Sequence, residues 1–178
     1  MACRGWAAIG VLAVTIAVTG CATDIAGVAQ PAPDSSAEVC SWLPVTDVQS
    51  AFGLSGLTAQ RNGPIFDHNV AAYLCVYADS DGSNDAALET ADFPDSAASP
   101  TQLVSNFASA GRVDSGSPQV GDASAFVDDL AGNANTAAVA VRKGGGRLRL
   151  VAIIVATSVG PDKNRLVSVL RGVFAKLP

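Results

Sequence analysis

The sequence contains few side chains whose type and spacing could support catalysis. Its single histidine, His68, lies next to Asp67, and a Ser-His-Asp hydrolase would have to use this pair. None of the motifs Gly-x-Ser-x-Gly, Ser-x-x-Lys, His-Glu-x-x-His and Gly-x-Gly-x-x-Gly occurs. The neighbouring carboxylates Asp128 and Asp129 would point to opposite sides of a strand, which does not favour acid–base work by a pair. We therefore predict no enzyme, no catalytic residue and no cofactor, and we interpret His68 as a surface or loop-packing side chain.

The residue types that bind metals are equally sparse. An acidic turn at residues 79–85 resembles a calcium loop in composition, but Gly82 stands at the fourth position instead of the sixth, and Thr90 replaces the closing glutamate. A zinc site is disfavoured because His68 is the only histidine and, of the four cysteines, only Cys40 and Cys75 remain after the export and lipidation predicted below. We predict a hairpin turn at residues 79–85 and no metal site.

The N-terminal cysteine Cys21 has a different chemistry. Arg4 precedes an uncharged apolar run at residues 5–18, which is shorter than the ~20 residues that span a bilayer, so residues 1–20 have the layout of a secretory signal. The stretch Val18-Thr19-Gly20-Cys21 resembles the bacterial lipobox, whose cysteine receives diacylglycerol and further acyl chains such as palmitate. We predict cleavage after residue 20 and a lipid-anchored protein on the outer side of the cell membrane. An ordinary signal peptide, or a short membrane anchor, is the alternative.

The composition limits the class of partner. The chain of 178 residues is 49% apolar and 15% charged, and its net charge is −5. This length fits one domain with a substantial core. An acidic surface repels phosphate backbones, so we expect no nucleic-acid binding. We divide the chain into a signal peptide (1–20), a lipidated N-terminus with a flexible tether (21–37) and one globular domain (38–178).

Two cysteines remain for the domain, Cys40 and Cys75. An exported domain with two remaining thiols usually pairs them, so we predict a disulfide that closes a loop of about 36 residues and contributes about 4 kcal/mol. The tether between Cys21 and Cys40 contains Pro31 and Pro33 and has no helical or strand periodicity. A short N-terminal strand packed on the domain is the alternative for this segment.

The periodicity of the domain predicts an α+β fold, a single domain with an antiparallel sheet and helices packed against it. A capping box at Thr46 and a stop at Gly53 delimit a first helix, Pro100 begins a second, and residues 160–177 form a third. The predicted strands are 57–61, 70–78, 86–93, 136–143 and 147–156, with a loop through Gly63-Pro64 and, at residues 120–127, a turn that passes into a further strand. The strand 147–156 is apolar on both faces beyond Arg149, which places it in the centre of the sheet.

Three aromatic residues lie near the predicted disulfide. Tyr73 and Tyr77 share one face of their strand with Cys75, and Trp42 follows Cys40 closely. They are our candidates for contact with a ligand or partner. The alternative is that they pack around the disulfide.

The assembled pattern resembles the small actinobacterial (mycobacterial-type) secreted lipoproteins that form a domain-of-unknown-function family with a lipobox and one cysteine pair. The shared features are Cys40 before a helix that ends in Gly53, Cys75 near Tyr77, the Gly121-Asp122-Ala123 turn, the 136–156 hairpin and the terminal Leu177-Pro178. The resemblance implies a Mog1/PsbP-like type of α+β sheet and a location in the cell envelope. It brings no catalytic residues.

Two classes of function follow from these predictions. The first is a non-catalytic envelope lipoprotein that binds a protein partner or supports an envelope assembly. The second is a small-molecule or lipid carrier with an apolar pocket between the sheet and the helices. A carrier should contain an apolar cavity, whereas a partner-binding protein should expose an apolar or aromatic patch.

Overall fold

Seven antiparallel strands form one open sheet in the part of the chain that the structure describes. This computed structural model describes residues 38–67, 70–114, 116–132 and 135–177. The strands are β1 (Thr58–Asp67), β2 (Val70–Ala78), β3 (Asn84–Pro94), β4 (Arg112–Val113), β5 (Ala123–Asp128), β6 (Asn135–Gly144) and β7 (Arg147–Ala156). Their order across the sheet is β1-β2-β3-β7-β6-β5-β4. The prediction of a single α+β domain with an antiparallel sheet is confirmed, and β7 lies at the centre as its apolar sequence predicts.

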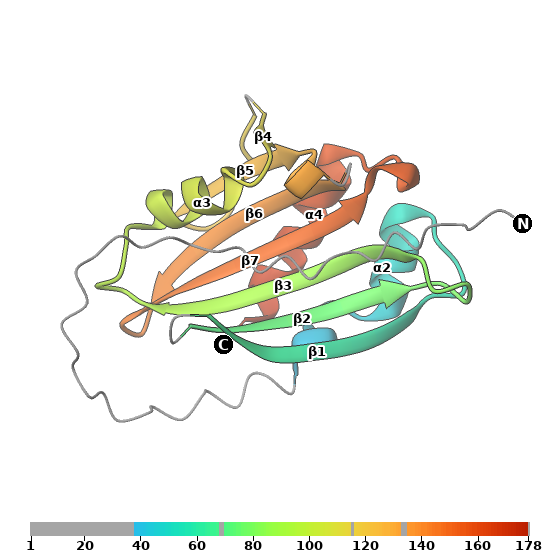
Figure 1. Ribbon diagram of the computed structural model, residues 1–178, viewed down its shortest axis with the longest axis horizontal. Coiled ribbons are helices and arrows are strands. Elements are labelled where there is room, and N and C mark those ends of the chain that lie inside the picture. The colour runs from blue at the N-terminus through green and yellow to red at the C-terminus, as the bar shows by residue number, and fades with distance from the viewer. Residues whose placement is uncertain (1–37, 68–69, 115, 133–134, 178) are drawn as a thin grey trace, which may run out of the picture.

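Helices cover both faces of this sheet. They are α1 (Val39–Trp42), α2 (Val45–Phe52), α3 (Pro100–Ala108) and α4 (Lys163–Lys176), with short 3-10 turns η2 (Leu130–Gly132) and η3 (Thr157–Val159). Helices α1, α2 and α4 lie on one face, which we call the first face, and α3 lies on the other, which we call the second face (Figure 1). None of the described helices is long and apolar enough to cross a membrane.

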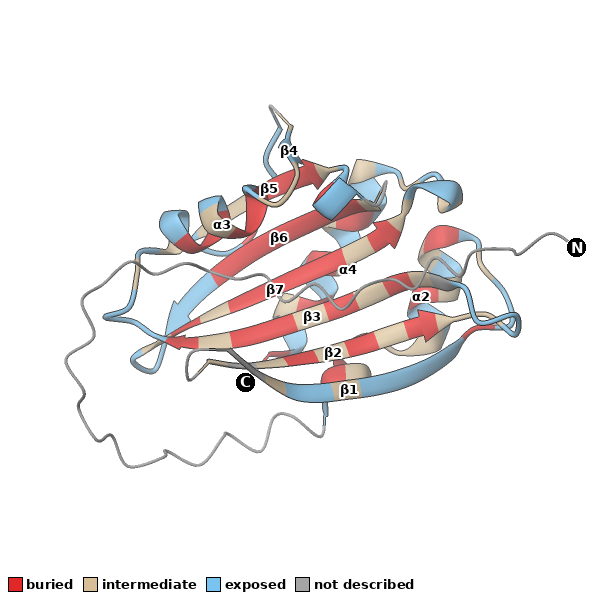
Figure 2. Cartoon of the chain, in the orientation of Figure 1, coloured by how far each residue is buried: buried red, intermediate tan, exposed pale blue. Residues whose placement is uncertain are grey.

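Strand alternation divides the apolar core between the two faces. On the first face Cys75, Leu88 and Ile153 lie side by side on β2, β3 and β7, beneath the helices of that face. On the second face Phe107 of α3 packs with Val139 and Leu150 of the sheet. The central strands are buried for most of their length, whereas β1 is exposed at the sheet edge (Figure 2).

The terminal helix shows why its sequence predicts it correctly. Asp162 precedes the first turn, and its side chain accepts a hydrogen bond from the backbone nitrogen of Asn164 at 2.8 Å. Leu166, Leu170 and Val173 recur at helical spacing and are all buried against the sheet. The N-terminal cap and the apolar stripe therefore both predict α4 as the structure shows it, with its apolar side against the sheet.

Three local predictions are wrong. The capping box fails because Pro44, not Thr46, precedes the first turn of α2, and the carbonyl of Pro44 already accepts hydrogen bonds from Asp47 and Val48. The predicted loop at Gly63-Pro64 is part of β1. Proline is tolerated there because β1 is an edge strand and its register with β2 shifts at a bulge between Asn62 and Ile65. The short strand β4 is not among the predicted strands.

Candidate functional site

The predicted disulfide joins Cys40 to Cys75. Cys40 is on α1 and Cys75 is at the middle of β2, where its side chain is fully buried. The two Cα atoms are 5.2 Å apart, although the residues are 35 positions apart in the chain. The bond therefore ties the four-residue helix α1 to the first face of the sheet.

The three candidate aromatic residues surround this bond in the core. Trp42, Tyr73 and Tyr77 are 5%, 5% and 0% exposed and belong to the same apolar cluster as Cys75. The hydroxyl of Tyr77 donates a hydrogen bond of 2.5 Å to the carbonyl of Leu43. Burial, with a smaller contribution from the charge of Asp47, raises the pKa of Tyr77 well above its usual value. In this state Tyr73 and Tyr77 present almost no surface to a ligand or partner.

Trp42 also contacts a charged pair that the sequence analysis missed. The guanidinium of Arg149 donates two hydrogen bonds to the carboxylate of Asp92, from Nε at 2.7 Å and from Nη2 at 3.0 Å. Its central carbon lies 5.6 Å from the ring centroid of Trp42. Both side chains of the pair are mostly buried, with 16% and 15% of their surface exposed. Asp92 on β3 and Arg149 on β7 lie directly opposite each other in the strand register, and their side chains lie on the first face.

A shallow groove of about 350 Å³ runs between α2 and α4 on the first face. Trp42 and Val173 line it, together with the charged residues Asp47 and Lys176. The side chains of Lys176 and Asp47 form an exposed ion pair at 3.2 Å. This groove lies between helices, whereas the pocket predicted for a carrier lies between the sheet and the helices.

Glu89 occupies an unusual position on the second face. The register of β2, β3 and β7 places Leu74 directly beside it on one side and Ala152 on the other. The next residues of the same three strands on this face complete a three-by-three array, which we call the Glu89 patch: Ala72, Leu74 and Val76 on β2, Ala87, Glu89 and Ala91 on β3, and Leu150, Ala152 and Ile154 on β7. All eight neighbours in this array are apolar. Glu89 is thus the only charged residue of the patch. Ala91, Leu150 and Ala152 are buried in the same cluster as α3, whereas Glu89 and its neighbours Leu74, Val76 and Ala87 are half-buried.

The electrostatics of Glu89 follow from these neighbours. The residue is half-buried, and desolvation of the carboxylate raises its pKa from 4.5 to about 7. Within the described residues its carboxylate accepts no hydrogen bond and forms no ion pair. The sequence carries a signal that we overlooked, because Ala87, Glu89, Ala91 and Phe93 alternate along β3 and therefore share one face.

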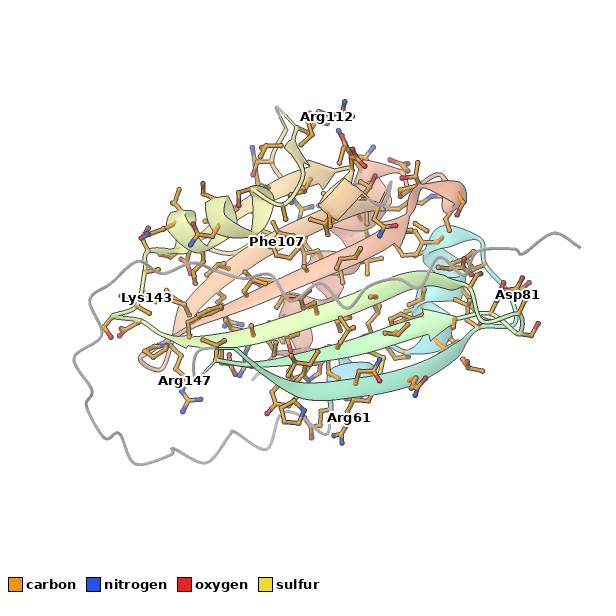
Figure 3. The ribbon with its side chains drawn as sticks, viewed as in Figure 1. Arg61, Asp81, Phe107, Arg112, Lys143 and Arg147 are labelled. Carbon is orange, nitrogen blue, oxygen red and sulfur yellow. A yellow bond between two sulfur atoms is a disulfide. The ribbon has the colours of Figure 1, made fainter. Side chains whose placement is uncertain are left out.

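Other acidic residues have structural roles. Asp79 accepts hydrogen bonds from the backbone nitrogens of Asp81 and Ser83, which confirms a hairpin turn at this position. Asp122, in the Gly121-Asp122-Ala123 turn, accepts one from the backbone nitrogen of Lys143 at 2.6 Å. Among the described residues no group of three or more potential metal ligands comes together. Figure 3 shows that Asp81 and Lys143 lie at opposite ends of the sheet.

Two predictions fall on residues outside the described ranges. The lipidation of Cys21, with the cleavage and tether around it, concerns residues 1–37, and the role of His68 concerns residues 68–69. The structure therefore does not test them. Comparison with protein-family models, with curated proteins and with solved structures found no match. The site must be interpreted from its own geometry.

Proposed function

We propose that this protein is a non-catalytic, lipid-anchored component of the cell envelope that binds a protein partner or supports an envelope assembly. Cys21 would carry the lipid, residues 21–37 would form the tether, and residues 38–178 would form the binding domain. The lipobox after an apolar run supports the anchor. The disulfide between Cys40 and Cys75 favours an oxidising compartment outside the cytoplasm.

One observation carries the proposal of a partner. Helix α3 packs mainly on β5 and β6, so among the described helices none covers the half of the second face that β1, β2 and β3 form (Figure 1). Leu74, Val76 and Ala87 on this half are half-buried, and they belong to neither apolar cluster of the core. A contiguous apolar area on a sheet face is typical of an interaction surface.

The finer fold type is part of the same proposal. A Mog1/PsbP-like arrangement is implied by the resemblance to the small actinobacterial lipoproteins, and an antiparallel sheet with helices on both faces is compatible with it. This similarity of architecture carries no function by itself.

Mass spectrometry of the protein from native cells tests the anchor. We expect Cys21 to be acylated and residues 1–20 to be missing, and the variant Cys21→Ala to leave the membrane fraction. An unmodified Cys21 would end the anchor proposal. Chemical crosslinking in intact cells tests the second part, because a reproducible protein neighbour is expected for the wild type.

A lipid or small-molecule carrier is the second candidate. The groove of about 350 Å³ between α2 and α4 is the observation that favours it. The groove is shallow and its lining includes the ion pair of Asp47 and Lys176, which is a poor environment for an acyl chain. Organic extraction of the purified protein distinguishes the two, since a stoichiometric lipid beyond that on Cys21 would favour the carrier.

A further inference from the structure

We propose that the half-buried part of the Glu89 patch on β2 and β3 is the docking surface for an amphipathic helix of a protein partner, and that the apolar side of this helix carries one lysine or arginine opposite Glu89. The inference rests on the proposed function and names the surface and the chemistry of the partner. It depends on three observations: the charge pattern of the patch, its dimensions and the composition of the competing occupants.

The charge pattern favours a cation at one point. Glu89 stands at the centre of eight apolar residues and has no partner among the described residues. An ionised carboxylate in such surroundings is costly, and a cation of the partner would offset this cost through charge-assisted hydrogen bonds. The desolvation that raises the pKa of Glu89 is evidence for the same environment. Above the pKa of Glu89 an entirely apolar partner would bury the ionised carboxylate without compensation, so the patch then discriminates against it.

The dimensions of the uncovered surface fit one helix. Neighbouring strands are about 4.8 Å apart, so the three strands β1, β2 and β3 span about 10 Å, close to the diameter of a helix with its side chains. On the other half of the second face, α3 already packs in this way through Leu103, Val104 and Phe107. A partner helix would therefore lie beside α3 on the same face and complete the layer.

The charge pattern disfavours the two occupants that this chain itself could supply. The tether at residues 22–37 contains Asp24 and Asp34 but no lysine or arginine, so it offers no cation to Glu89. A second copy that docks the same patch symmetrically would bring two Glu89 carboxylates together, which like-charge repulsion opposes. A separate protein with a basic residue opposite Glu89 would supply the cation and would avoid the repulsion between two carboxylates.

A site-specific photocrosslinker in the full-length chain, expressed in its native cells, tests the proposal. Gln60 is exposed on β1 and lies directly beside Val76 at the rim of the patch, so the crosslinker replaces Gln60. The control position is Val113 on β4, which is 57% exposed. We expect a protein adduct at position 60 whose linked peptide has a lysine or arginine among apolar residues at helical spacing.

The same experiment with two further variants tests the role of the charge. Glu89→Gln keeps the shape of the side chain, and we expect it to lower the yield of the adduct at position 60 about tenfold at pH 8. Asp47→Asn removes the same charge from the opposite face of the molecule and should leave the yield unchanged. Retention of the disulfide and of the circular dichroism spectrum confirms that each variant is folded.

Several results would overturn the inference. The first is an adduct at position 60 that links residues 22–37, a second copy of the chain or a lipid. The second is a linked peptide without a basic residue. The third is an adduct yield that Glu89→Gln does not change. A protein adduct at position 113 with none at position 60 would refute the inference and leave the proposed function standing. The absence of any protein adduct at both positions, in a folded and anchored chain, would refute both.

Discussion

Replacing Glu89 with glutamine is expected to abolish a pH dependence of stability that the wild-type protein has between about pH 4.5 and pH 7. The apolar neighbours on β2, β3 and β7 raise the pKa of Glu89 from 4.5 to about 7 in the folded state. Between pH 4.5 and pH 7 the carboxyl group of Glu89 is therefore protonated in the folded protein and ionised in the unfolded chain. The stability that the protonated carboxyl contributes is therefore complete below pH 4.5 and is lost as the pH rises through 7.

The magnitude follows from the two pKa values. They differ by about 2.5, and each whole pKa difference corresponds to about 1.36 kcal/mol, so the free energy of unfolding should fall by about 3 kcal/mol across this range. Because Glu89 keeps partial contact with solvent, this is the largest change that we expect. With a urea m-value of about 2 kcal/mol per molar, the unfolding midpoint would move by about 1.5 M.

Urea unfolding of the oxidised protein at several pH values between 4.5 and 8 measures this effect. The wild type should lose stability with rising pH relative to Glu89→Gln, and the two curves should become parallel above pH 7. Glu38→Gln is the matched control because it makes the same chemical change at an exposed glutamate, and it should follow the wild type. Parallel curves for the wild type and Glu89→Gln over the whole range would show that the patch does not desolvate the carboxylate.

Two further perturbations test the fold around the site. Replacing both Cys40 and Cys75 with alanine should lower the free energy of unfolding by about 4 kcal/mol, as expected for a loop of about 36 residues, and an unchanged urea midpoint would contradict this. Gly121→Ala and Gly132→Ala both place a side chain at a φ near +70°, but a Cβ at position 121 would lie 2.4 Å from the carbonyl oxygen of Val141, whereas one at position 132 meets nothing within 4 Å. Thermal and urea unfolding should show that Gly121→Ala is more destabilising than Gly132→Ala by about 1–3 kcal/mol, and equal losses would refute the steric argument.

Much of the fold could be predicted because its signals are local. The apolar stripe of α4, the glycine turn between β6 and β7 and the alternation along β2 each depend on residues within one element. The pairing of Cys40 with Cys75 was also predictable, since no other cysteines of the proposed domain compete for it. The central place of β7 followed from a strand that is apolar on both faces.

One error comes from a competing local signal, and another from the position of a strand in the sheet. Pro44 precedes α2 and displaces the capping role that the pattern assigned to Thr46. Pro64 lies within β1 because a strand at the sheet edge does not need every backbone nitrogen for pairing. The burial of Tyr73 and Tyr77 beneath the helices of the first face agrees with the alternative that these aromatics pack around the disulfide.

The sequence by itself determined the cysteine pair, the types of most elements and the apolar side of each, because these depend on spacing along the chain. Only the tertiary structure decided which strands lie beside β3, and therefore that Leu74 and Ala152 flank Glu89 from positions far apart in the chain. It also decided that α3 covers one half of the second face and that no described helix lies over Leu74, Val76 and Glu89 on the other half. The environment of a carboxylate depends on all of its neighbours in space, and strand order sets those neighbours without leaving a local pattern in the sequence.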